Sequence, residues 1–372
     1  MKQALAILYF LRECAGRGER AALVTLTDVT GSAARAPGEH MAVAESGQSV
    51  GSFSGGCVEA AVIAEAQDVL SEGRARHVRF GDGSRYIDIR LPCGGGIDLL
   101  FTPAPDRQQI DRAIALLEQR APVTLHLTLD GGLWVAAAGE DDRTMWHAAM
   151  FAVRHDPGLR LIVMGHGSEP AAMLDIARAY GADVMLFSPQ ASLIQEAREK
   201  GIAADLLRFV GRAPGLSVDP WTAVVVLFHD HDWETELLLQ VLRQNPFFVG
   251  AMGSTRTHAE RSRRLLDAGS ARHDLERIIG PVGLIKASRD PQTLALSIMA
   301  QVVDAYETMM IRSAHGTAAT AMRIPHPPVE LLAPFNPVVA ALSPSITGDA
   351  QETATTVAGS ARKEDQVHAG QF

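Results

Sequence analysis

The sequence predicts an α/β protein with two folded parts, an α+β domain followed by a Rossmann-like domain with a parallel sheet. The chain has 372 residues, which suffices for two or three domains of ordinary size. Its residues are 47% hydrophobic, enough to fill a core without disulfide bonds. Near residue 150 the pattern changes from a run of strands to a regular alternation of strands and helices.

The first part, residues 1–138, is expected to form the α+β domain. It opens with an amphipathic helix and continues with β-branched and apolar runs. Asp130, Gly131 and Gly132 separate the last two runs, which predicts a hairpin. The expected strands cover 21–34, 77–80, 87–91, 97–101, 123–129 and 133–138, and the expected helices after the first cover 57–72 and 111–119.

A mixed linker over 139–158 is expected to lead into the Rossmann-like domain at 159–323. Apolar strands separated by helices are typical of a parallel sheet that is buried on both faces. The expected strands are 159–165, 183–188, 222–228 and 247–253, and the expected helices include 192–199, 235–245, 257–269 and 291–310. From 324 to 372 the composition turns to Pro, Ala, Ser and Thr, which predicts a disordered tail.

Composition also limits the partners and the compartment. The net charge of −9 argues against nucleic-acid binding, which needs an excess of Lys and Arg. The three cysteines show neither zinc spacing nor an even count for a disulfide framework. We find no apolar run of the roughly 18 residues that a membrane span requires, and no signal-peptide cleavage site. A cytoplasmic protein without a membrane partner is therefore expected.

A glycine-rich segment before the helix at 57–72 is the first candidate binding site. Backbone N–H groups of Gly55 and Gly56 would point at an anion there, and the helix dipole would favour a thiolate at Cys57. Ser32 and Arg35 on the preceding loop could add hydrogen bonds to a phosphate. The alternative remains open that Cys57 is a small buried hydrophobic residue, as most free cysteines are.

A second thiol, Cys93, opens another glycine-rich loop with Gly94 and Gly95. If the two loops meet, both thiols and many N–H donors would face one cavity. The alternative is a tight turn in which the thiol is incidental.

Two further candidate sites follow strands of the second part. Gly165 and Gly167 form a loop related to the dinucleotide-binding pattern. The acidic residue expected about twenty positions later is missing, because Ser188 and Gln190 stand there, and this argues against NAD(P).

Polar residues follow the next two strands. His229 and Asp230 come after an apolar strand; we rank contact with a polar ligand first, a solvated loop second and a metal third. Gly253, Ser254 and Arg256 lead into a helix and form another candidate anion site.

These segments together resemble a known family. The matching stretches are GSAARAPGEHMAV, VGSFSGGCVEAAV, LPCGGG, FHDHDWETELL, FVGAMGSTRTHAERSRRL, IIGPVGL and LALSIMAQVV. In order and spacing they resemble the XdhC/CoxF family of accessory factors for xanthine dehydrogenase and related molybdenum hydroxylases. The resemblance covers about residues 1 to 310.

The resemblance implies a maturation factor rather than a catalyst. Such a factor binds the molybdenum cofactor (molybdopterin) in its sulfurated form and delivers it to the large subunit of a molybdenum hydroxylase, with a cysteine desulfurase as the sulfur source. Cys57 matches the family cysteine, which is expected to lie near the molybdenum. The other residues on family motif positions are Arg35, Gly55, Gly56, Glu59 and Cys93.

The sequence also departs from the family pattern. The Rossmann loop reads GHGS where the family reads GAGH, and Gln301 stands where a Glu is usual. These changes argue against dinucleotide binding and indicate a client other than xanthine dehydrogenase proper. Two alternative functions stay open, an NAD(P)-dependent oxidoreductase and a cofactor-free scaffold that joins the apo-enzyme to the desulfurase. A homodimer through the helices at 57–70 and 291–303 is also expected.

Overall fold

The structure is a computed structural model in which residues 1–321 group into one compact unit. The residues that it describes are 2–31, 35–56, 58–84, 94–229, 232–286 and 288–315. The tail expected over 324–372 and the strand expected over 87–91 lie outside these residues.

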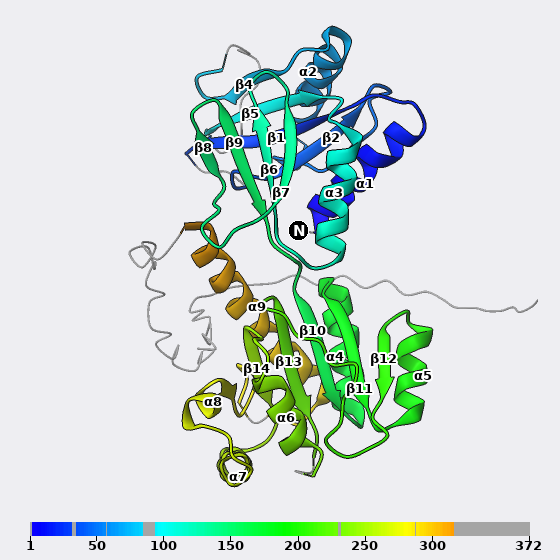
Figure 1. The fold of residues 1–372 in the computed structure, drawn as a ribbon, viewed down its shortest axis with the longest axis vertical. Coiled ribbons are helices and arrows are strands. Elements are labelled where there is room, and N and C mark those ends of the chain that lie inside the picture. The colour runs from blue at the N-terminus through cyan, green and yellow to red at the C-terminus, as the bar shows by residue number, and fades with distance from the viewer. Residues whose placement is uncertain are drawn as a thin grey trace, which may run out of the picture. The chain divides into compact units, whose positions relative to one another are not determined.

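The amino-terminal part is built on a five-stranded antiparallel sheet (Figure 1). Its elements are α1 (Lys2–Gly16), β1 (Ala21–Thr30), β2 (His40–Ala44), β3 (Ser49–Val50), α2 (Glu59–Glu72), β4 (Arg76–Gly81) and β5 (Gly96–Pro103). The strand order is β3-β2-β1-β5-β4. Val24 and Leu26 of β1 share a core with α2, whereas Ala21 and Leu23 share one with α1. Because both faces are covered, the first seven residues of β1 are all buried.

A second, four-stranded sheet completes this part. Its elements are α3 (Arg107–Glu118), β6 (Val123–Thr128), β7 (Leu133–Ala137), β8 (Met145–His147) and β9 (Met150–His155), in the order β7-β6-β9-β8. The hairpin predicted around Gly131 is present, with Leu127 opposite Leu133. The linker expected over 139–158 is wrong for β8 and β9, because Phe151 and Val153 bury in the same core as β6.

The carboxyl-terminal part is the predicted parallel sheet with helices on both faces (Figure 1). Its strands are β10 (Arg160–Gly165), β11 (Asp183–Ser188), β12 (Ala203–Leu206), β13 (Thr222–Leu227), β14 (Phe248–Ala251) and β15 (Ile278–Ile279). Its helices are α4 (Ser168–Tyr180), α5 (Ala191–Glu199), α6 (Glu234–Leu242), α7 (Thr255–Asp267), α8 (Arg272–Glu276) and α9 (Pro291–His315).

The order of the six parallel strands, β12-β11-β10-β13-β14-β15, is that of dinucleotide-binding Rossmann folds. Leu161 and Val163 of β10 face the core shared with α4, α5 and α9, and Ile162 and Met164 face the core shared with α6. Successive side chains of a strand point to opposite faces of the sheet. Both sets are apolar in β10 because helices cover both faces. The predicted fold class is confirmed.

The helix α9 is the one described helix that is long and apolar enough, by length and composition, to span a membrane. The sequence was expected to hold no apolar run of this length, and Pro291–Ile311 corrects that expectation as far as length and composition go. In the structure Ile298, Met299 and Val302 pack against the sheet, as in the core helix of a folded domain. Packing of this kind accounts for part of the apolar composition, because a third of the candidate span is buried whereas Leu296 is 57% exposed.

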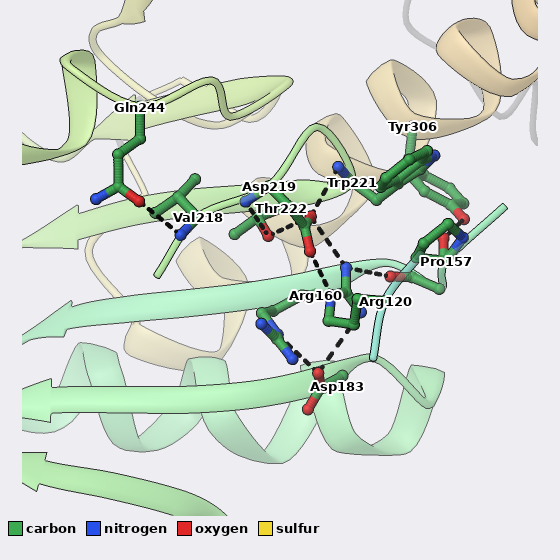
Figure 2. Close-up of polar contacts among 11 residues, drawn as sticks. Arg120, Pro157, Arg160, Asp183, Val218, Asp219, Trp221, Thr222, Gln244 and Tyr306 are labelled. Atoms are coloured by element: carbon green, nitrogen blue, oxygen red, sulfur yellow. Dashed lines mark hydrogen bonds and ion pairs between the residues drawn. The ribbon is translucent and has the colours of Figure 1, made fainter. Parts of the chain in front are cut away.

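Arg120, which follows α3, contacts the segment before β13 (Figure 2). Its guanidinium donates to both carboxylate oxygens of Asp219 and to the carbonyl oxygen of Gly158. Asp219 also accepts from the Trp221 N–H at 2.9 Å and the Thr222 hydroxyl at 2.8 Å. Burial alone would raise the pKa of Asp219, but the hydrogen bonds from Arg120 and Thr222 outweigh it and lower that pKa. Arg120 thus ties α3 to the Rossmann sheet.

Candidate cofactor-binding site

Three connecting segments leave one edge of the five-stranded sheet, and we call their described residues the edge loops: 31 and 35–39, 51–56 and 58, and 82–84 with 94–95. Their common origin follows from the register, in which Gly96 lies opposite both Thr30 and Gly81, and Val50 lies opposite Ala42. Two of the loops touch, because a Cβ added to Gly31 would stand 3.2 Å from Cα of Gly95. This contact joins the segment that carries Arg35 to the segment that carries Cys93. Cys57 and Cys93 lie outside the described residues, so the meeting of their two loops stays a prediction.

Arg79 of β4 holds the edge where these two loops meet. Its guanidinium donates to the carboxylate of Asp98 at 2.6 Å, the hydroxyl of Thr30 at 2.9 Å and the carbonyl of Asp82 at 2.7 Å. A Cβ at Gly96 would stand 2.6 Å from the guanidinium, so only glycine fits beneath it. Sequence reasoning missed Arg79, because a lone Arg in a short strand carries no local signal for these partners.

Glu59 in the first turn of α2 organises the loop 51–58. Its carboxylate accepts hydrogen bonds from the N–H groups of Phe53 (3.0 Å), Ser54 (2.8 Å), Gly56 (2.7 Å) and Val58 (3.2 Å). The hydroxyls of Ser52 and Ser54 donate to it as well, at 2.7 and 2.8 Å. Partial burial alone would raise the pKa of Glu59, but these donors outweigh it and lower the pKa to about 2.

This arrangement corrects one expectation from the sequence. The N–H groups of Gly55 and Gly56 were expected to be open to an anion, but Gly56 donates to Glu59 and Gly55 donates to the Ser52 hydroxyl at 2.9 Å. A carboxylate in the first helical turn competes with an external anion for these N–H donors, because the helix dipole attracts it and the donors lie within a few residues. The chain itself therefore supplies the anion of this nest.

The edge loops still present open surface. Among the described residues, no atom lies within 4 Å of a Cβ added to Gly55, Gly56 or Gly94. Arg35 is exposed on the first loop, whereas Gly95 is buried. A flat ligand could approach these glycine backbones closely, with a guanidinium nearby.

Three predicted site residues of the connecting segments, Ser32, Cys57 and Cys93, lie outside the described residues. The described thiol is Cys14 of α1, which is fully buried in the core beside α3. Burial raises the pKa of Cys14, as expected for an unreactive structural cysteine. Cys14 is therefore a natural reference for the other two thiols.

The second candidate region is the crevice between β10 and β13, where the strand order reverses. Gly165 must be glycine, because a Cβ there would stand 2.5 Å from the Leu227 carbonyl oxygen. The N–H of Gly167 donates to the side-chain oxygen of Gln190 at 3.0 Å. The carboxylate of Glu169 lies 3.3 Å from the His229 ring. Acceptors of the chain thus stand where a dinucleotide phosphate would need donors.

The residues after β14 have a structural role in capping α7. The Ser254 hydroxyl accepts from the Thr257 N–H at 3.1 Å, and Gly253 adopts a positive φ of 132°. Arg256 is exposed on the first turn of this helix. The structure brings Gly165, His229 and Gly253 to the carboxyl edge of one sheet, while Asp230 lies outside the described residues.

A buried ion pair behind this edge was missed by sequence reasoning. Arg261 of α7 donates to both oxygens of Glu234 at 3.1 and 3.0 Å, and both side chains are almost fully buried. Arg261 also donates to the carbonyl oxygen of Met252 at 2.5 Å, and so fixes the turn that follows β14. A lone Glu and Arg in two separate helices give no sequence sign that they meet.

The fold and these regions define a class of protein in which an α+β domain with glycine-rich edge loops precedes a Rossmann domain. A family model described as the XdhC and CoxI family matches residues 14–81, and one described as the XdhC Rossmann domain matches residues 161–302. The molybdenum cofactor insertion chaperone PaoD of Escherichia coli is 37% identical over 296 residues, which cover 80% of this chain and 86% of PaoD. The chain belongs to the XdhC and CoxI family, as its motifs predicted.

Two more distant relatives agree with this assignment. A protein of Bacillus subtilis described as a probable xanthine dehydrogenase subunit is 24% identical over 324 residues, 77% of this chain and 93% of that protein. A crystal structure described as a xanthine dehydrogenase from Bacillus halodurans is 23% identical, with a TM-score of 0.63 over 81% of this chain and 96% of that chain. The likeness to the solved structure confirms the fold.

Proposed function

We propose that this protein is a maturation factor that binds the molybdenum cofactor and delivers it to a molybdenum hydroxylase. The observation that carries the proposal is the similarity to PaoD, which extends over 86% of a protein named as a molybdenum cofactor insertion chaperone. An insertion factor needs a surface that shelters a fragile anionic ligand and then releases it. The edge loops of the amino-terminal domain offer such a surface.

The binding site is proposed at the edge loops. The open faces of Gly55, Gly56 and Gly94 leave room for a bulky planar ligand. Arg35 is the exposed cation for the ligand's phosphate, because the nest amides are already bound to Glu59. Cys57, between the anchored residues Gly56 and Val58, is assigned to the molybdenum end, since thiolates are soft ligands.

The finer parts of the proposal concern form and partners. We propose that the bound cofactor is the sulfurated form and that its sulfur comes from a cysteine desulfurase. The client that receives the cofactor is proposed to be the large subunit of a molybdenum hydroxylase. We also assign the protein to the cytoplasm, a reducing compartment in which cysteine thiols stay reduced.

Deletion of the gene from its host tests delivery. The expected result is a hydroxylase that is made and folded but purifies with little molybdenum, and that regains the metal when the gene is restored. Hydroxylases with unchanged metal content in the deletion strain would contradict the proposal. A pull-down from cofactor-deficient cells distinguishes this proposal from the scaffold alternative. A scaffold would still bind the hydroxylase in these cells, whereas a cofactor carrier would not.

An NAD(P)-dependent oxidoreductase remains the second candidate, because the strand order is that of dinucleotide-binding folds. The acceptors at the crevice, Gln190 on the Gly167 N–H and Glu169 beside His229, argue against it. Gln301 in place of the usual Glu accepts from the Gly283 N–H at 2.7 Å, a structural task that either side chain can perform. We therefore propose no nucleotide role for this domain.

A further inference from the structure

The loop between β12 and β13 carries the most exposed large apolar side chain among the described residues. Phe209 is 68% exposed, and its neighbour Val210 is 55% exposed. We call residues 208–212 the tip. Adjacent exposed apolar side chains at a loop end are typical of an interaction surface.

The tip is held in place by α6. The side chain of Gln240 donates to the carbonyl oxygen of Gly211 and accepts from the N–H of Ala213 at 3.3 Å. Further along the loop, the side-chain oxygen of Gln244 accepts from the N–H of Val218 at 2.8 Å, as Figure 2 shows. A loop fixed in this way loses little conformational freedom when it binds.

A hollow of about 870 Å³ lies beside the tip, between the tip and α5. Its apolar lining includes the buried side chains of Phe187, Ile194 and Leu207, and Phe209 stands in its wall. The hollow also has a polar lining, which includes Gln195, Arg198 and Glu199, so an occupant must bring both apolar and charged groups, as the tip does. Two copies related by a twofold axis can each insert the same residue into the other.

Charges on this face are arranged in the same self-complementary way. Arg208 and Arg212 flank Phe209, and within the described part of the chain neither guanidinium makes a hydrogen bond or ion pair. Glu199 and Asp205 supply carboxylates to the same hollow. Across a twofold axis the guanidinium groups of one copy can meet the carboxylates of the other.

We propose that the tip and the hollow form the interface of a twofold dimer of this chain. Phe209 of each copy enters the hollow of the other, and a Phe buried in this way removes about 150–250 Å² from water. Arg208 and Arg212 meet the carboxylates that line the other copy's hollow. This surface differs from the helix pairing expected from the sequence, and it does not depend on the proposed function.

The mass of the full chain by sedimentation equilibrium tests the proposal. The wild type is expected to show twice the mass of one chain, and Phe209→Asp is expected to raise the dimer dissociation constant more than about tenfold, or 1.4 kcal/mol. The matched control is Leu296→Asp, because Leu296 is 57% exposed on α9, within the helix pair expected from the sequence. A monomeric wild type overturns the proposal, as does a dimer that only the Leu296 variant dissociates.

A charge exchange makes the test independent of the apolar contact. One variant carries Arg208→Glu with Arg212→Glu, and the other carries Glu199→Arg with Asp205→Arg. Each alone is expected to be monomeric and folded by circular dichroism, since all four side chains are exposed. Mixing the two is expected to restore a dimer, because each tip then faces opposite charges. Variants that stay monomeric when mixed would contradict the pairing.

Discussion

The edge loops of the amino-terminal domain and the crevice of the Rossmann domain look alike in sequence but differ in chemistry. Both place glycines before a helix, and in both a side chain of the chain itself accepts from the loop amides. In the edge loops Glu59 draws four N–H groups and two hydroxyls together. In the crevice the amide oxygen of Gln190 accepts from a single N–H, and the carboxylate of Glu169 lies 3.3 Å from the His229 ring.

The difference shows that a glycine-rich loop before a helix is not by itself an open anion site. Whether its amides are available depends on acceptors within reach, such as a Glu in the first helical turn. In the edge loops the internal anion leaves the glycine faces open and Arg35 exposed, so a ligand can still bind beside it. In the crevice the acceptors stand where the ligand phosphate would be.

The largest effect is expected behind the crevice, where Arg261 and Glu234 form a buried pair. Arg261→Ala leaves the Glu234 carboxylate buried without this partner, and should lower the free energy of unfolding by about 3–5 kcal/mol. Urea denaturation of the wild type and the variant measures this difference in the free energy of unfolding. The control is Arg263→Ala, an exposed pair with Glu260, which should lose less than about 1 kcal/mol. Equal small losses would show that the buried pair does not hold this edge.

In the edge loops, Glu59→Gln should lower the free energy of unfolding by about 1–3 kcal/mol, because charged hydrogen bonds are replaced by weaker ones. The pH dependence gives a sharper test. The folded pKa of Glu59, about 2, lies below the usual 4.5, so its stabilisation is complete above pH 4.5 and is lost as the pH falls toward 2.

The stability difference between the wild type and Glu59→Gln should therefore shrink steadily as the pH falls from 5 toward 3. Urea denaturation at several pH values measures that difference. The control is Glu118→Gln, in which the replaced carboxylate accepts one hydrogen bond from Tyr9. A difference for Glu59→Gln that stays constant over this range would mean that the carboxylate does not organise the loop.

The smallest effect is expected for nucleotide binding at the crevice. NADH fluorescence should show no saturation with the wild type up to about 1 mM. Glu169→Gln combined with Gln190→Ala frees the Gly167 N–H and removes a charge, so weak binding should become measurable. Glu199→Gln serves as the control, since it lies on α5 away from the loop. Tight binding by the wild type would revive the oxidoreductase alternative.

The sequence allowed the fold class and most long elements to be predicted, because apolar periodicity over ten residues is a strong signal. It missed β2, β3, β12 and β15, which have two to five residues and too few positions for a clear period. It also took β8 and β9 for a linker, although Phe151 and Val153 alternate inward. The segment of β9 becomes a strand because it pairs with β6, which lies more than twenty residues earlier in the sequence.

For the site, the glycines and Arg35 were recognisable from the sequence, whereas their partners were not. Glu59 stood in the family motif, yet its task of filling the nest depends on the path of loop 51–58. Arg79 and the pair Arg261–Glu234 act through contacts between separate elements, which local patterns do not encode. The sequence shows where the glycines stand, but only the folded structure shows whether their N–H groups are already hydrogen-bonded.

The central claim is that the edge loops hold a molybdenum–pterin ligand through Cys57. Molybdenum and pterin content of the protein, purified from cells that make the cofactor, measures it directly. We predict near-equal metal and pterin in the wild type and in Cys14→Ala, and a severalfold loss of both in Cys57→Ala. Unchanged content in Cys57→Ala, or a wild type without either component, would contradict the account.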